Sequence, residues 1–574
     1  MRLSPKWGWF AAFTAVFAVC AAYVFWGTWS PEMAPVMPDC PTSYPTHWFR
    51  ARLVSWLENG KFTPAEAINW IGSPYLWTEF QYAFAAFMSA LGMVYFLRGR
   101  GLPRVAAYGA GLLLAFSGYW FTLFSAGHLG WFQWMTYGVF AFGLIDRALE
   151  KGKPRHWLLL GACLAWGSMH QPDLWLLFSV FSAAYFVFRL LVVFVGMARD
   201  ARRAALVKWA KGAAMALAAL LAIGGANFRS AFVNDLAGRD KQIEEGQTLG
   251  ANAAKDDAEK RWIFVTNWSM PPEATKEFWH AGIEGDTSCP FTLAIGQKHG
   301  NGIRQYVGRL GRPLGATQGN YRQHSLYVGW VTCFLAVLGL LSALLPWLRD
   351  AGHETRATGD GRQSTMDSPS NTNNSAIIFF AVSAVVFWLF SMGRYCEPVY
   401  RLVYALPFGD YLRAPVKWHH LTEFCLCVLA GYGLAMLRFR FVPSALRKAS
   451  PDSSPAANRA ALIATSLVAM WVVIGLTHLV PNARLYCAPH RADADMQFVD
   501  GRMLQDPRGV AQLNQMRARV LGTYQGAALI EVPKKKPKDE PAPELPSPQP
   551  VTLALGILSL VGTLAVGAYG IKKS

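Results

Sequence analysis

Long apolar runs separated by short connectors constrain this chain more than any other feature of its sequence. A run of about twenty apolar residues is long enough to cross the hydrocarbon core of a membrane as a helix. Such runs recur along the 574 residues and predict about twelve spans. They lie near 7–29, 80–97, 105–124, 129–145, 157–171, 174–195, 209–228, 325–348, 376–392, 420–437, 460–480 and 551–571. We therefore expect an all-α polytopic membrane protein.

The composition agrees with this fold class. Hydrophobic residues make up 53% of the chain and charged residues only 16%, which is too apolar for an ordinary soluble protein. The formal net charge of +18 would suggest a nucleic-acid partner in a soluble chain. Here Lys and Arg fall mostly in the connectors, which is the positive-inside pattern of membrane proteins. We therefore expect membrane lipids around the chain and no nucleic acid bound to it.

The charged connectors also predict the orientation and the division of the chain. If the spans alternate, the connectors rich in Lys and Arg all lie on one side, which places both termini in the cytoplasm. The other side then holds the larger loops, where we expect the chemistry. The predicted parts are a core over 1–437 with external loops at 30–79, 229–324 and 393–419, a connector and span over 438–480, an external segment over 481–550, and a last helix over 551–574.

The first external loop contains a candidate catalytic carboxylate. Asp39 follows the first expected span, in a loop stiffened by Pro38, Pro41 and Pro45. A carboxylate there could accept a proton or hold a divalent cation where a lipid-borne substrate surfaces. The alternative is that Asp39 only solvates the loop.

Two short external turns carry further polar groups. His128 lies in one turn, and His170, Gln171 and Asp173 lie in the other. If both turns meet the Asp39 loop around one cavity, the set suits general base catalysis or a hard cation with mixed oxygen and nitrogen ligands. Each has a structural alternative. His128 would be an interfacial histidine bonded to a carbonyl, and Asp173 would be the N-cap of the helix that follows.

A basic segment precedes the tenth expected span. Arg413, Lys417, His419 and His420 lie where a lipid phosphate would be at the outer interface, and Arg binds such an anion through two N–H groups. The alternative is that the cations snorkel toward an aromatic belt. Glu423 lies within about one turn of the membrane and is a candidate counter-ion of Arg413 or Lys417.

The order of these motifs resembles a known group of proteins. The motifs are the Asp-containing loop at 39–61, Gly127-His128, His170-Gln171, Ser269-Met-Pro-Pro-Glu273, Tyr327-Val-Gly329 and Leu406-Pro-Phe followed by Leu412-Arg-Ala-Pro-Val-Lys417. In this order they resemble the YfhO-like bacterial membrane proteins, which belong to the GT-C class of polytopic glycosyltransferases. The resemblance covers about residues 7–437.

The resemblance implies a reaction and a location. A polyprenyl-phosphate-linked sugar would be the donor, and transfer to a cell-envelope acceptor would occur with inversion on the outer face of the bacterial inner membrane. Asp39 would be the base, Arg413 and Lys417 would hold the departing phosphate, and His128, His170, Gln171, Asp173 and His419 would contact donor or acceptor. GT-C members differ in their need for a metal, so a divalent cation such as Mg²⁺ or Mn²⁺ stays open. Two departures are the short external segment at 481–550 and the His-Gln-Pro-Asp form of the second turn.

Two other functions compete with the enzyme. A lipid or sugar transporter or flippase would use the cavity as a path, and it predicts charged residues deep within spans. A non-catalytic scaffold subunit of a larger complex would keep the fold without the activity. Because the sequence puts its charges at one face, the expectation favours the enzyme.

Overall fold

A computed structural model gives the fold. It describes residues 5–24, 33–35, 63–64, 74–118, 130, 133–230, 240, 243, 256–279, 326–344, 369–406, 409–441 and 487–489. Within these residues the regular secondary structure is helical apart from two three-residue strands, β1 (Met33–Pro35) and β2 (Cys487–Pro489). The strands are antiparallel with Ala34 opposite Ala488, so they join the segment after α1 to the segment near residue 488.

Ten longer helices form the body of the described chain. They are α1 (Pro5–Val24), α4 (Pro74–Gly99), α5 (Arg104–Ala115), α8 (Met135–Lys151), α9 (Pro154–Ser168), α10 (Pro172–Gly196), α11 (Arg199–Ser230), α14 (Trp330–Leu344), α16 (Pro369–Ser391) and α18 (His419–Phe441). Shorter elements are α13 (Asp257–Thr266), η4 (Pro272–Phe278), η6 (Gly393–Cys396), α17 (Glu397–Tyr404), η7 (Gly409–Tyr411) and η8 (Pro415–Trp418).

The helical membrane character is as the sequence predicts. Five stretches of the described chain are long and apolar enough to cross a membrane: 81–99, 173–196, 199–229, 373–391 and 415–437. Shorter apolar helices cover much of α1, α5 and α14. The count of about twelve spans stays a prediction, and its stretches at 460–480 and 551–571 lie outside the described residues. One boundary differs, because the expected connector at 199–211 forms the first turns of α11.

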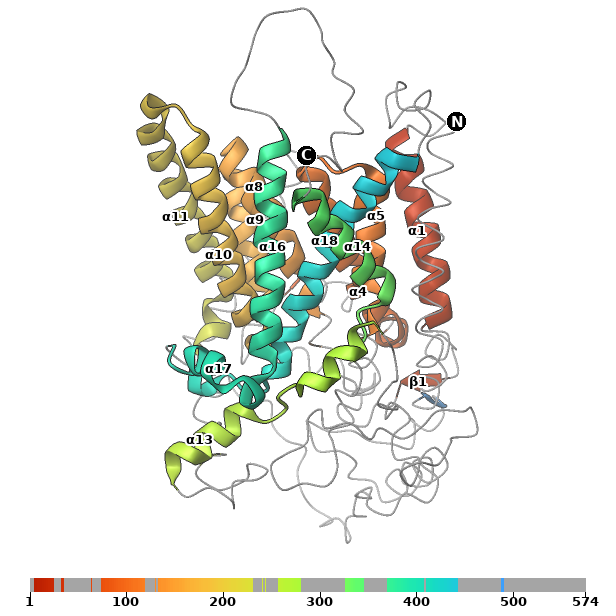
Figure 1. Ribbon diagram of the computed structural model, residues 1–574, viewed down its shortest axis with the longest axis vertical. Coiled ribbons are helices and arrows are strands. Elements are labelled where there is room, and N and C mark those ends of the chain that lie inside the picture. The colour runs from red at the N-terminus through yellow and green to blue at the C-terminus, as the bar shows by residue number, and fades with distance from the viewer. Residues whose placement is uncertain are drawn as a thin grey trace, which may run out of the picture.

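The helices form a bundle with α18 at its centre. Figure 1 shows α18 between α14 and α16, with α1 and α11 at opposite edges of the bundle. Helix α18 also packs on α5, α4 packs on α5 and α8, and α9 packs on α8 and α11. The short helices α13 and α17 lie across the lower end of the bundle in this view. The N-terminal ends of α10 and α18 reach this lower end, which we call the loop end.

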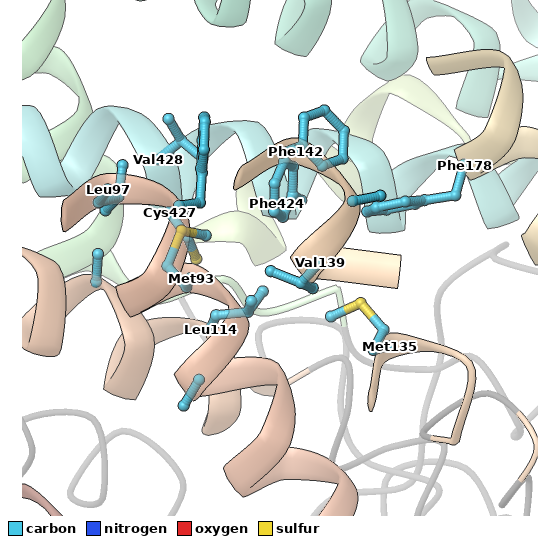
Figure 2. Close-up of a cluster of buried hydrophobic side chains, with 14 of the residues drawn as sticks. Met93, Leu97, Leu114, Met135, Val139, Phe142, Phe178, Phe424, Cys427 and Val428 are labelled. Atoms are coloured by element: carbon cyan, nitrogen blue, oxygen red, sulfur yellow. The ribbon is translucent and has the colours of Figure 1, made fainter. Parts of the chain in front are cut away.

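An apolar core joins α4, α8, α10 and α18. Figure 2 shows Phe142, Phe178 and Phe424 gathered from three of these helices, with Met93 and Cys427 beside them. The ring centroids of Phe142 and Phe424 are 4.8 Å apart, and those of Phe178 and Phe424 are 5.4 Å apart. Because lipid is as apolar as these side chains, their close packing rather than the removal of water holds the helices together. This core fixes the N-terminal end of α18 against its neighbours.

Glycine allows α14 and α18 to approach closely. A Cβ at Gly433 would collide with the backbone carbonyl of Leu335, and a Cβ at Gly339 would collide with that of Leu429. Small residues at helix crossings let backbones approach in this way in membrane bundles. The crossing holds α14, and the segment just before it, against the central helix.

Candidate functional site

The candidate site lies at the loop end, where α18 and α10 begin. The segment leading into α18 passes through η8, and the segment leading into α10 contains the His170 turn. Five of the sequence-predicted site residues fall on or next to these two helix starts. Asp39 and His128 lie outside the described residues. The structure therefore describes the α10 and α18 part of the predicted constellation.

Asp173 and Lys417 form a buried ion pair. The Lys417 ammonium donates to a carboxylate oxygen of Asp173 at 2.5 Å, although 244 residues separate them in sequence. The two side chains are only 10% and 12% exposed. The N-cap of α10 is Gln171, and Asp173 is the second residue of the helix. The alternative of Asp173 as an N-cap is therefore wrong, and the carboxylate links α10 to η8.

His419 lies inside the protein. Its side chain is fully buried, and its Nε2 is 3.2 Å from the backbone carbonyl of Leu326. The ring centroid of Phe278, in η4, lies 4.5 Å from that of the imidazole. These contacts join the start of α18 to the segments before α14 and after α13. His419 thus holds these segments together at the loop end.

Glu423 is buried with two polar neighbours. The Ser117 hydroxyl, just after α5, donates to one oxygen of Glu423, and the Nδ1 of His420 lies 3.6 Å from the other. These contacts pair Glu423 with Ser117 and His420 and not with Arg413 or Lys417. The predicted counter-ion role of Glu423 is therefore wrong. The carboxylate instead ties the first turns of α18 to the end of α5. Sequence reasoning missed Ser117, which lies within an apolar run and carries no motif.

Arg413 stacks on the side chain of Trp268, which lies between α13 and η4. Its guanidinium carbon lies 4.1 Å from the centroid of Trp268 and 5.2 Å from that of Phe264. Trp residues give the strongest cation–π contacts. The contact holds the guanidinium beside the loop between α13 and η4, at the boundary between bundle and loops.

Two strained backbone positions meet at this contact. Trp268 has φ +60° and Ala414 has φ +67°, and they are the two non-glycine residues with positive φ within the described chain. The Val416 amide donates to the Trp268 carbonyl at 3.2 Å, which joins the two strained segments. Such conformations cost of order 1–3 kcal/mol each and gather at functional sites. The strain thus marks this junction as a candidate functional element.

Arg394 supports the Trp268 segment, and sequence reasoning missed it. Its guanidinium donates to the Thr266 carbonyl at 2.9 Å and to the Asn267 side-chain oxygen at 3.2 Å. Its backbone amide donates to the Ser269 hydroxyl at 3.0 Å. Burial lowers the pKa of this guanidinium, which still stays protonated near neutral pH. Arg394 therefore fixes the backbone that carries Trp268.

His170 and Gln171 form a separate corner of the same end. The His170 ring lies parallel to that of Tyr137, with centroids 5.8 Å apart. A Cβ at Gly130 would come within 2.9 Å of the His170 carbonyl and 3.2 Å of the Gln171 side-chain oxygen. This close approach places Gly130 against the turn that contains His170 and Gln171. The ring contact thus joins His170 to Tyr137 of α8.

No metal centre is present within the described residues. Nowhere in them do three or more His, Cys, Asp or Glu side chains lie close enough together to hold an ion. The buried carboxylates Asp173 and Glu423 are engaged by Lys417, Ser117 and His420. A divalent cation held by Asp39 stays an expectation, because that loop is not described.

A second buried polar network lies toward the opposite end of the bundle. Asp146 of α8 accepts from Arg189 at 2.6 Å and from the Tyr185 hydroxyl at 2.9 Å, both of α10. Arg100 approaches the same carboxylate at 3.8 Å. Asp146 and Arg189 are 1% and 2% exposed. The expectation that charges gather at one face was therefore wrong. In the sequence, Arg189 within the apolar run 174–195 already indicated a buried charge.

Comparison with known proteins adds no relative. No protein-family model matches the chain, and no curated protein or solved structure matches it either.

Proposed function

We propose that this chain is a membrane glycosyltransferase that moves a sugar from a polyprenyl-phosphate donor to an extracytoplasmic acceptor. The observation that supports this most is the buried pair of Lys417 and Asp173 at the loop end, beside Arg413 on Trp268. A lipid-linked donor places its phosphate at the membrane boundary and its sugar just outside. In this proposal the cations of the site lie at that boundary, with a carboxylate beside them.

The ion pair suits the charge that develops in such a transfer. Negative charge grows on the phosphate as the glycosidic bond breaks, and preorganised cations stabilise it. In the proposed mechanism Lys417 exchanges Asp173 for a phosphate oxygen, and Asp173 then accepts a hydrogen bond from a sugar hydroxyl. Arg413 binds a second phosphate oxygen, since a guanidinium on a ring face still offers N–H donors. Asp39 would deprotonate the acceptor, as the YfhO-like resemblance implies.

Transfer from synthetic donors tests the proposal. Purified protein in detergent is mixed with a panel of polyprenyl-phosphate sugars, with and without a divalent cation. We expect turnover by the wild type, none by Asp39→Asn, and a loss of about 10²–10³-fold by Lys417→Met. Glu397→Gln is the matched control, because it removes a carboxylate that is 49% exposed and that pairs with Arg401 rather than with Lys417. If the protein binds lipid phosphate but turns over none of the donors, the glycosyltransferase proposal is contradicted.

One observation favours a second function, a lipid or sugar transporter or flippase. Arg189 and Asp146 are charged, buried and inside the bundle, and charged residues in spans mark substrate or proton paths. Reconstituted vesicles with a fluorescent polyprenyl-phosphate in one leaflet separate the two functions. Translocation by wild type that Arg189→Met abolishes, without sugar transfer, would support the transporter. Absence of translocation leaves the enzyme as the function that the site supports best.

A further inference from the structure

Glu423 is a buried carboxyl group that the proposed transfer does not use. It lies about one turn into α18, within the apolar stretch 415–437, and its side chain is fully buried. None of the Lys and Arg side chains in the described chain lies within ion-pair distance of it, and the Nδ1 of His420 is 3.6 Å from its Oε2. An ionised carboxyl is costly to bury without a cation, and such a group takes up a proton instead.

Two other buried acids in the described chain show the contrast. Asp146 has the guanidinium of Arg189 at 2.6 Å, and Asp173 has the ammonium of Lys417 at 2.5 Å. Each of these carboxylates has a cation at hydrogen-bond distance that balances its charge. Glu423 has a hydroxyl and an imidazole instead.

The hydroxyl of Ser117 contacts two oxygen atoms at once. Its Oγ lies within hydrogen-bond distance of Oε1 of Glu423 and 3.2 Å from the backbone carbonyl oxygen of Tyr327. A hydroxyl has one hydrogen to donate and lone pairs to accept, whereas a carbonyl oxygen can only accept. If Glu423 is ionised, Ser117 can donate to only one of the two oxygens at a time. If Glu423 carries a proton, it donates to Ser117, Ser117 donates to Tyr327, and both contacts are hydrogen bonds.

The carbonyl at the end of this chain is held in place by its surroundings. A Cβ at Gly118 would come within 2.9 Å of the Tyr327 carbonyl oxygen, so the segment after α5 lies directly against it. The Val328 amide donates to the Phe278 carbonyl at 3.0 Å, which fixes the next residue. The two contacts of Ser117 therefore join α18, the end of α5 and the segment before α14.

The other described groups around this carboxyl include no permanent cation. Phe424, the next residue of α18, packs on rings of α8 and α10 (Figure 2). Cys427, one turn further along α18, and Cys333 of α14 are the titratable groups that follow it into the bundle, and both are free thiols. Lys417, in the segment before α18, is held by Asp173. A proton is therefore the positive charge that this position can hold.

We propose that Glu423 is a proton-binding site inside the bundle and carries a proton at neutral pH. The carboxyl O–H donates to Ser117, and the Ser117 hydroxyl donates to the Tyr327 carbonyl. The protonated form thus ties α18 to α5 and to the segment before α14. Loss of the proton leaves a carboxylate among apolar side chains and removes one of the two hydrogen bonds. The inference is independent of sugar transfer, since a transferase, a transporter or a scaffold could hold such a proton.

Infrared spectroscopy of the full-length protein in detergent at pH 7 tests the site. A protonated carboxyl gives a C=O stretching band that is separate from the bands of carboxylates. The difference spectrum of wild type minus Glu423→Gln should contain this band, and the band should shift in D2O. Asp173→Asn is the matched control, because it removes a buried acid that has a cation. Its difference spectrum should contain carboxylate bands instead.

Ser117→Ala supplies a second measurement. This variant removes the acceptor of the carboxyl O–H, so the band of Glu423 should move to higher wavenumber and keep its intensity. Loss of the band in Glu423→Gln, together with this shift, supports the site. Carboxylate bands without a carboxyl band in the Glu423→Gln difference spectrum overturn it, because Glu423 is then ionised. If thermal unfolding shows that Glu423→Gln does not fold, Ser117→Ala decides alone, and a carboxyl band that is absent or unmoved overturns the proposal.

Discussion

The ion pair between Asp173 and Lys417 allows one prediction to be worked from its geometry. At 2.5 Å two unit charges attract by about 6–7 kcal/mol at an effective dielectric constant near 20. Desolvation of both ions offsets several kcal/mol of this. A net coupling of about 2–3 kcal/mol remains, because the side chains are close to buried yet not fully removed from solvent. The pair should therefore stabilise the contact of α10 with η8.

A double-mutant cycle measures this coupling. We expect Lys417→Met and Asp173→Asn each to lower the free energy of unfolding by about 2–4 kcal/mol, since each leaves the other group without its buried partner. The double variant should be less destabilised than the sum of the two. Equilibrium unfolding in mixed detergent micelles, followed by tryptophan fluorescence, gives the four values. A coupling energy below about 0.5 kcal/mol would refute the reasoning, because charges this close and this buried cannot then be interacting.

Three further predictions concern the bundle. Gly433→Leu should separate α14 from α18 and lower the free energy of unfolding by at least about 2 kcal/mol, while the control Gly225→Ala, with open space at its Cβ, should not. Arg189→Met should cost about 3–5 kcal/mol in the same assay, because it leaves Asp146 buried without its closest cation. Burial, and then the neighbouring cations, lower the pKa of His156 to about 4. Protonation therefore favours the unfolded state, and stability should fall as the pH drops from about 6.5 toward 4, by up to about 1.4 kcal/mol per pH unit. His156→Gln should flatten that slope.

The sequence by itself determined the class of the fold and the place of most helices. Apolar run length is a local property, and a run of about twenty residues needs a helix to satisfy its backbone in lipid. In the structure Pro172 begins α10 and Gly152 caps α8, because proline fits the first turn and glycine the left-handed cap. Motif order also placed Asp173 and Lys417 in one hypothesis before any contact between them was known.

Only the tertiary structure decided which of these groups meet. A sequence lists Lys417, Asp173 and Glu423 with equal weight, yet partners depend on how helices cross. The pairing of Lys417 with Asp173, and of Glu423 with Ser117 and His420, follows from the packing of α18 against α10 and α5. The strain at Trp268 and Ala414 is also invisible in sequence, since neither residue type favours positive φ. The physical reason is common to all: periodicity is fixed by neighbours in the chain, whereas burial and ion pairing are fixed by neighbours in space.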